Sequence, residues 1–206
     1  MDNSIIVAQP LGQPAQLILL FHGVGASATD MATTGSYVAR TLPNAMVVSV
    51  DAIHPSDFGR GRQWFSVQGI TETNRVQRIA EAMPAFENTI RYWQQRANIS
   101  AQNTLLIGFS QGAIMLLEST QLNEPLANKI FAIAGRFAQP PHTKPNIGKV
   151  YLLHGDQDKV IAVDYSKSAT ESFKHFEVPV VLDIFQNLGH GIDARVMERI
   201  VEHIQE

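Results

Sequence analysis

Short apolar segments alternate with amphipathic ones along the whole chain, and this alternation constrains the fold more than any other feature. The apolar segments have the length of strands and are rich in Val, Ile, Leu and Phe, which is typical of parallel strands covered on both faces. They span residues 17–21, 45–50, 104–109, 130–134, 150–153 and 180–185. Segments with helical spacing lie at 28–42, 73–97, 111–122, 162–176 and 192–204. The sequence therefore predicts an α/β fold with a mostly parallel sheet and helices on both of its faces.

The length of the chain suits a single domain of this kind, and the pattern predicts that it spans residues 1–206. Two long connections, 52–71 and 136–148, interrupt the alternation. Because the alternation continues beyond both, neither is expected to be a domain linker, and no room is left for a large cap domain. Pro84 lies inside the 73–97 segment and is expected to kink or split that helix, since proline lacks an N–H and clashes with the preceding turn.

Composition excludes several classes of protein. The chain has no cysteine, which excludes disulfides, Cys-ligated metal sites and cysteine nucleophiles. A net charge of −3 argues against nucleic acid as a partner. No segment approaches the roughly 18 apolar residues that span a bilayer, and the first residues lack the basic region of a signal peptide. We therefore expect a cytoplasmic protein, monomeric or homodimeric, that inserts into no membrane.

One predicted strand leads into a serine flanked by glycines. The strand at 104–109 runs into Gly108-Phe109-Ser110-Gln111-Gly112, and a predicted helix follows directly. In this strand–turn–helix context, G-x-S-x-G indicates a sharp turn that strains the serine backbone and projects Oγ above the sheet edge. Ser110 is therefore the candidate nucleophile, with a purely structural turn as the alternative.

A serine hydroxyl needs a base, and the base needs an acid to orient it. His190 follows the strand at 180–185 in a glycine-flanked loop and is the candidate base. Two acids follow the strand at 150–153. Asp158 is preferred as the orienting acid, partly on the resemblance given below, and Asp156 is expected to fix the turn through side-chain hydrogen bonds to backbone N–H groups.

The segment after the strand at 17–21 reads H-G-V-G and is open to two interpretations. In the first, it supplies one of two donors to the oxyanion of an acyl-transfer reaction. The backbone N–H groups of Val24 and of Gln111, the residue after the serine, are then the candidate oxyanion hole.

In the second interpretation the same segment binds a dinucleotide. Gly23, Gly25 and Ala28 match G-x-G-x-x-A between a strand and a helix, and Asp51 ends the next strand, where a ribose-binding acid belongs. An NAD(P)-binding protein is therefore an alternative. It explains only this segment and leaves the serine, the acid and the histidine at the later strand ends without a role.

Taken together, these motifs resemble the α/β-hydrolase superfamily and, within it, the small carboxylesterase and acyl-protein thioesterase family. The resemblance runs from about Pro14 to the end of the chain and implies that Asp158 is the acid of a catalytic triad. It departs at Ala113, where the family has glycine, and at Ser66, where it has an acid. Its markers are LFHGVG at 20–25, QWF at 63–65, GFSQG at 108–112, AGRF at 134–137, HGDQD at 154–158 and GH at 189–190.

The resemblance implies a serine hydrolase that forms an acyl-enzyme and cleaves small carboxylic esters, or thioesters, of short to medium acyl chains, with no metal or organic cofactor. Trp64 and Phe65 in the 52–71 loop are expected to line an apolar substrate site, although Trp64 equally suits an anchor of the loop on the core. Arg60 and Arg62 are expected on the solvated surface. A non-catalytic binding module of the same fold is the remaining alternative.

Overall fold

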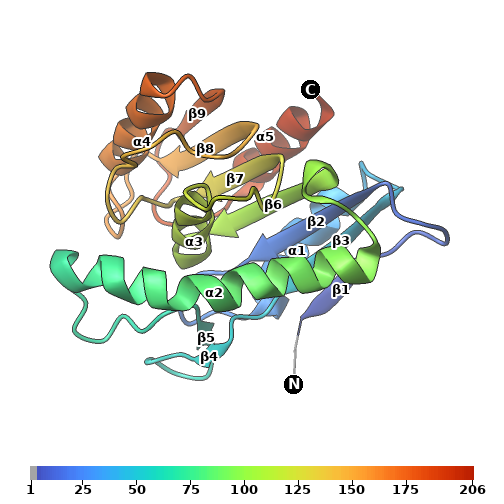
Figure 1. Ribbon diagram of the computed structural model, residues 1–206, viewed down its shortest axis with the longest axis horizontal. Coiled ribbons are helices and arrows are strands. Elements are labelled where there is room, and N and C mark those ends of the chain that lie inside the picture. The colour runs from blue at the N-terminus through green and yellow to red at the C-terminus, as the bar shows by residue number, and fades with distance from the viewer. Residues whose placement is uncertain (1–3) are drawn as a thin grey trace.

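The computed structural model describes residues 4–206 and is built on a seven-stranded sheet with helices on both faces (Figure 1). Each strand is parallel to its neighbours except the first, which runs antiparallel to β3. In pairing order the strands are β1 (Ile5–Ala8), β3 (Ala45–Val50), β2 (Gln16–Phe21), β6 (Thr104–Phe109), β7 (Lys129–Ile133), β8 (Lys149–Gly155) and β9 (Val180–Phe185). The predicted fold class is confirmed.

The helices divide between the two faces of the sheet. The face that holds the larger apolar cluster is covered by α2 (Glu72–Ala97), α3 (Gln111–Ser119) and α4 (Asp164–His175). The other face is covered by α1 (Ala28–Ala39) and α5 (Ala194–Gln205). A short 3-10 turn, η1 (Ala101–Asn103), precedes β6, and a separate ribbon of β4 (His54–Pro55) and β5 (Arg62–Gln63) lies in the 52–71 loop.

The central strands are buried on both sides, which explains why their sequences are continuously apolar. In β2, Leu17 and Leu19 pack into the cluster under α2, α3 and α4, whereas Ile18 and Leu20 pack under α1 and α5. All four side chains are fully buried. A strand with one solvated face would instead alternate apolar and polar residues.

Two details differ from the sequence-based expectations. The edge strand β1 was not expected, because four residues, three half-buried and one exposed, carry too weak a pattern to mark a strand. The expected split at Pro84 is wrong, since α2 continues through it as one helix. Pro84 and Ala80, whose carbonyl loses its partner there, both lie on the exposed side of α2, so water is available to that carbonyl.

Asp57 organises the long 52–71 loop. Its carboxylate accepts hydrogen bonds from the Gln63 amide, the Ser66 hydroxyl and two backbone N–H groups that follow. These bonds, that of Gln63 first, lower the pKa of Asp57 to about 2. Ser66, where the family carries an acid, is thus a structural partner within the loop. Among residues 4–206, no helix combines the length and apolar character that crossing a membrane requires.

Candidate active site

Ser110 lies in the sharp turn between β6 and α3, with φ 51° and ψ −114°. This positive φ is the strained conformation that the glycine-flanked motif predicts. The glycines are required by close packing. A methyl group on Gly112 would lie 2.3 Å from the carbonyl oxygen of Phe21, and one on Gly108 would lie 2.7 Å from the nitrogen of Ala113. The turn therefore holds Ser110 at the N-terminus of α3, at the carboxyl edge of the sheet.

The three residues that the sequence singles out meet at this edge. Nε2 of His190 lies 2.9 Å from Oγ of Ser110, and Nδ1 lies 2.6 Å from Oδ2 of Asp158. They come from the loops that follow β6, β8 and β9, whose carboxyl ends lie at the same edge. The side chain of His190 keeps 17 % of its surface exposed, whereas that of Asp158 is fully buried. A hydrogen-bonded chain thus runs from a buried carboxylate through an imidazole to a hydroxyl.

Asp158 is held as a carboxylate. Burial raises its pKa, but hydrogen bonds from His190 and from the backbone N–H groups of Ile161 and Val160 outweigh this effect and leave the pKa below its ordinary value. Oδ1 of Asp156 is buried and has no hydrogen-bond partner among residues 4–206, so this oxygen makes none of the expected turn-fixing bonds.

The two backbone donors predicted from the sequence are those of Val24 and Gln111. Neither N–H has a backbone or side-chain acceptor within the described part of the chain. The loop that carries Val24 comes close to Ser110 at Gly23, where a methyl group would lie 3.1 Å from Cβ of Ser110. The positive end of α3 also points at this position. The arrangement suits stabilisation of a negative oxygen that develops next to Ser110.

Comparison with known proteins agrees with this geometry. The family model described as Phospholipase/Carboxylesterase matches residues 2–206. The chain belongs to this family. Esterase YpfH of Escherichia coli strain K12 is 44 % identical over 206 residues, which are all of this chain and 89 % of that protein. Acyl-protein thioesterase 1 of Kluyveromyces lactis is 24 % identical over 225 residues, covering 99 % of this chain and 97 % of the relative.

Solved structures extend the family likeness to the fold. Esterase PE8 superposes with a TM-score of 0.89 at 26 % identity, and the match covers 99 % of this chain and 98 % of that one. The Bacillus cereus carboxylesterase has a TM-score of 0.83 at 16 % identity, with 100 % and 94 % covered. This second likeness concerns the fold alone. The protein is a carboxylesterase-type hydrolase.

In this hydrolase Asp51, the acid of the dinucleotide interpretation, helps to hold the loop that carries Val24. Asp51 accepts a hydrogen bond from the N–H of Ala28 through Oδ1, and its Oδ2 lies 3.2 Å from Nε of Arg62. The backbone of Arg62 in turn pairs with that of Gly25 and Ala26. A ribose-binding acid needs a free carboxylate, and both oxygens of Asp51 are engaged. The NAD(P)-binding interpretation therefore has no acidic residue available to bind the ribose.

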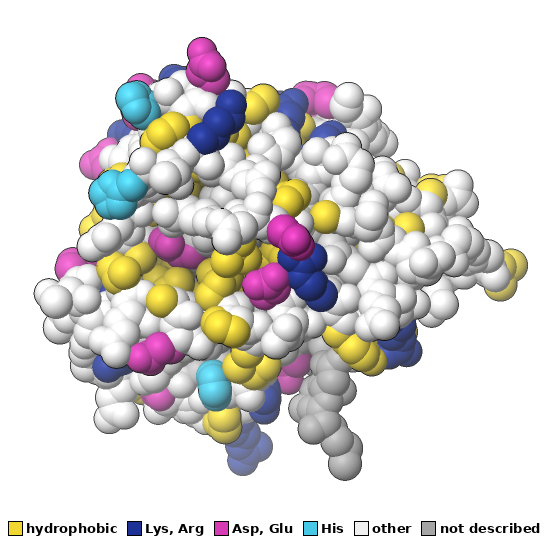
Figure 2. All heavy atoms as spheres, viewed as in Figure 1, with side chains coloured by type: hydrophobic (Ala, Val, Ile, Leu, Met, Phe, Trp, Pro, Cys, Tyr) yellow, Lys and Arg dark blue, Asp and Glu magenta, His cyan; other side chains and the backbone are white. Residues whose placement is uncertain are grey.

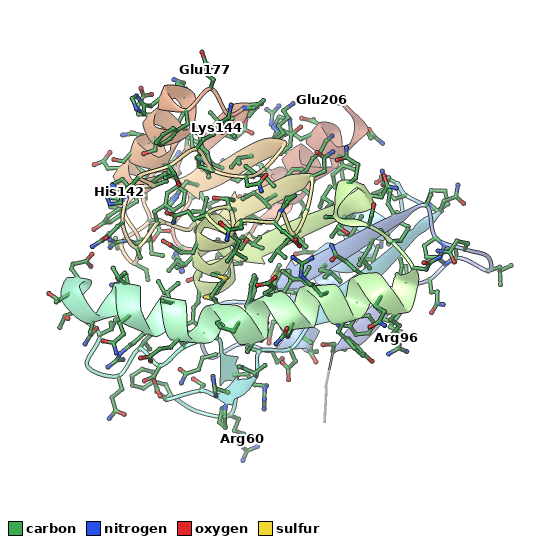
Figure 3. The ribbon with its side chains drawn as sticks, in the orientation of Figure 1. Arg60, Arg96, His142, Lys144, Glu177 and Glu206 are labelled. Atoms are coloured by element: carbon green, nitrogen blue, oxygen red, sulfur yellow. The ribbon has the colours of Figure 1, made fainter. Side chains whose placement is uncertain are left out.

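The aromatic pair of the 52–71 loop packs into the core. Trp64 and Phe65 are 1 % and 4 % exposed. The Trp64 ring meets Phe21 and Phe86 at centroid distances of 5.5 and 5.0 Å. This packing favours the anchoring interpretation of Trp64 over a wall that contacts substrate. Arg60, at the tip of the same loop, points away from the body of the molecule, in agreement with its expected surface position (Figure 3).

Sequence reasoning assigned no role to the side chain of Gln111. Its Oε1 accepts a hydrogen bond of 2.7 Å from the N–H of Trp64, and its Nε2 donates one of 2.7 Å to the carbonyl of Phe65. The side chain is buried, so these bonds are shielded from water. Gln111 thereby ties the 52–71 loop directly to the turn of the nucleophile. The only sequence signal is its position next to Ser110.

His154, the first residue of the HGDQD segment, contacts Asp158. Its Nδ1 lies 2.7 Å from Oγ of Ser166, and its Nε2 lies 2.8 Å from the carbonyl of Ile161 and 3.2 Å from Oδ2 of Asp158. Burial lowers the pKa of His154, which keeps the imidazole neutral. These partners fit a proton on Nε2, which faces the carboxylate, and a hydroxyl that donates to Nδ1. The four-residue spacing in H-G-x-x-D is the signal that relates the two.

Proposed function

We propose that this hydrolase cleaves carboxylic esters through a triad of Ser110, His190 and Asp158. The observation that carries the proposal is the pair of hydrogen bonds, 2.6 and 2.9 Å long, that links the three side chains at the strained turn. Because Asp158 is held as a carboxylate, it fixes the imidazole tautomer and stabilises the imidazolium that forms in the reaction. A non-catalytic binding module has no need of this arrangement.

In the acylation step, Oγ of Ser110 attacks the carbonyl carbon of the ester while Nε2 of His190 takes the hydroxyl proton. The N–H groups of Val24 and Gln111 stabilise the oxyanion of the tetrahedral intermediate. When the intermediate collapses, the bond from carbon to the leaving oxygen breaks. That oxygen takes the proton from His190, and the acyl group stays on Ser110.

In the deacylation step, water replaces the alcohol. His190 takes a proton from water as its oxygen attacks the acyl carbon, and the same two N–H groups hold the new oxyanion. The bond to Oγ then breaks, and Ser110 recovers its proton from His190. The steps balance without a metal or organic cofactor. All three triad residues come from one chain, so a monomer or a homodimer is catalytically complete.

The substrates that suit this site are small esters and thioesters with short to medium acyl chains. Within residues 4–206 no cap domain covers the carboxyl edge of the sheet, and the side chain of His190 beside Ser110 keeps 17 % of its surface exposed. The same triad chemistry serves thioesters, because a thiolate leaves more readily than an alkoxide. The Kluyveromyces lactis relative, whose name is that of an acyl-protein thioesterase, supports this second class.

The test is replacement of the nucleophile together with active-site labelling. We expect Ser110→Ala to lower kcat for a p-nitrophenyl ester by about 10⁴- to 10⁶-fold, as removal of a triad nucleophile does in other enzymes. A fluorophosphonate probe should label the wild type on Ser110, located by mass spectrometry, and should not label the variant. A variant that keeps most of its activity, or a wild type that takes no label, contradicts the triad.

A further inference from the structure

A pocket of about 390 Å³ opens beside His190, on the side of the sheet that α1 and α5 cover, and the mechanism above leaves it unassigned. None of its lining residues comes from the 52–71 loop, whose Trp64 and Phe65 pack under α2 on the opposite face. Its walls come from the start of α1, the turn of the nucleophile and the segment that follows His190. They include Ala26, Met31, Thr33, Phe109, Ile192 and Met197.

The pocket begins at the triad. His190 and Gly23 are themselves part of its wall. The ring of Phe109, the residue before Ser110, lies 5.0 Å from the His190 ring, centroid to centroid. A methyl group on Gly23 would lie 3.1 Å from Cβ of Ser110 and 3.3 Å from the Phe109 ring. A group placed in this pocket is therefore in contact with the base and beside the nucleophile.

Because the pocket lies next to His190, its position indicates whether it binds the acyl portion or the alcohol portion of the ester. In acylation, the leaving oxygen receives its proton from Nε2 of His190, so the first carbons of the leaving group must lie against that ring. We propose that this pocket binds the alcohol portion of the substrate and sets the enzyme's preference among leaving groups. The inference rests on the proposed triad and adds to it a binding site for the leaving group.

The lining defines the chemistry of that alcohol. The side chains of Met31, Phe109, Ile192 and Met197 make the pocket largely apolar, and methionine adapts its shape to different chains. None of its lining residues is Lys or Arg, and Asp30 places a carboxylate at its edge. An anionic leaving group would find no counter-charge there. The preferred substrates are thus esters of uncharged, apolar alcohols of short to medium length, which fits a volume near the lower end for ligand pockets.

The test varies the alcohol and the acyl group separately. In the first series, acetate esters run from methanol to hexanol, so every substrate forms the same acetyl-enzyme and differences in kcat/KM belong to acylation. We expect kcat/KM to rise about fourfold per methylene until the pocket is filled, the equivalent of about 0.8 kcal/mol for each buried CH₂. In the second series the alcohol is constant and the acyl chain grows.

Two matched tryptophan substitutions on α1 then locate the effect. Thr33 is exposed and forms part of the pocket wall, whereas Ser36, one turn later, is exposed and does not. Thr33→Trp should lower the hexyl-to-methyl ratio of kcat/KM by about tenfold, because the ring occupies volume that several methylenes would fill. Ser36→Trp should keep the wild-type ratio. Met197→Trp, from the α5 wall, should act as Thr33→Trp does.

Specific results overturn the inference. The inference is wrong if the enzyme is active and takes the fluorophosphonate label, but Thr33→Trp and Met197→Trp leave the hexyl-to-methyl ratio of kcat/KM unchanged. It is also wrong if these substitutions change the preference among acyl chains and not the preference among alcohols. An ester whose alcohol ends in a carboxylate should be cleaved at least about tenfold more slowly than its neutral isostere, and equal rates would contradict the charge argument. A wild type that neither takes the label nor hydrolyses any ester overturns the proposed function, and this inference with it.

Discussion

At the scale of single residues, the site depends on groups that the reaction never touches. Gln111 offers its backbone N–H to the oxyanion in the proposed mechanism, while its side chain holds the backbone of Trp64 and Phe65. His154 faces the carboxylate of Asp158. Local sequence points to Ser110 because a strained turn needs glycines on both sides. It does not point to such supporting contacts, which form between segments far apart in the chain.

The Gln111 side chain therefore makes a testable contribution to stability. Gln111→Ala leaves a buried N–H and a buried carbonyl without partners, each costing about 1–3 kcal/mol, so we expect a loss of about 2–6 kcal/mol in the free energy of unfolding. Urea denaturation measures it. Gln77→Ala is the control, since Gln77 is exposed and its amide donates to exposed Glu81; it should change stability by less than about 0.5 kcal/mol. Equal losses in both variants would contradict the role of the Gln111 contacts.

At the scale of elements, a half-buried carboxylate connects α3 to the 136–148 connection. Glu118 accepts a hydrogen bond of 2.5 Å from the N–H of Ala138 and one of 2.8 Å from the Gln121 amide. It lies against an apolar groove between α2 and α3, where hydrophobic side chains gather around α2 on the face seen in Figure 2. Burial raises the pKa of Glu118 to about 7, although the Ala138 bond and the charge of Arg136 act in the opposite direction.

This pKa predicts a stability that falls as pH rises. Between the ordinary value of 4.5 and about 7, the folded state binds the Glu118 proton more tightly than the unfolded state does. The proton-linked stability is present below about pH 4.5 and is lost by about pH 7. Glu118→Gln cannot lose a proton, so its stability relative to wild type should rise by up to about 3 kcal/mol between pH 4.5 and 8.

Urea unfolding of both proteins at pH 4.5 and 8 gives the comparison. Glu124→Gln removes an exposed carboxylate and tests for the general effect of one negative charge fewer. A Glu118→Gln variant that differs from wild type by the same amount at both pH values would show that this carboxylate does not titrate in the range.

The hydrophobic pattern of the sequence predicts some secondary-structure elements and misses others. The six parallel strands were all predicted. The central ones are buried on both faces, which leaves an apolar segment that periodicity detects, and the largely half-buried edge strand β9 is still apolar at every position except Asp183. Edge strand β1 was not predicted, since a short half-buried strand carries little signal. The helix through Pro84 is kept by tertiary packing, because Met83 and Phe86 are buried against the core on either side of the proline. Helix propensity alone predicts that α2 ends before this proline.

At the scale of the whole molecule, the site exists only when the sheet is assembled. Ser110, Asp158 and His190 come from loops after three strands. The two tryptophans lie in the core, Trp64 under α2 and Trp93 on the buried side of α2 itself. We expect loss of esterase activity and the change in tryptophan fluorescence to share one urea midpoint, as in cooperative unfolding. Activity lost at a distinctly lower urea concentration would show that the His190 loop opens independently of the core.

The sequence by itself determined the alternation of strands and helices, the turn of Ser110, and the residue types at the ends of the strands. These features are local, because periodicity and glycine requirements act over a few neighbouring residues. Only the tertiary structure decided that Asp158 and not Asp156 meets His190, that Asp51 holds a loop, that Trp64 is an anchor, and that an apolar pocket opens beside the base. Those outcomes depend on distances between segments that lie far apart along the chain, which no local pattern encodes.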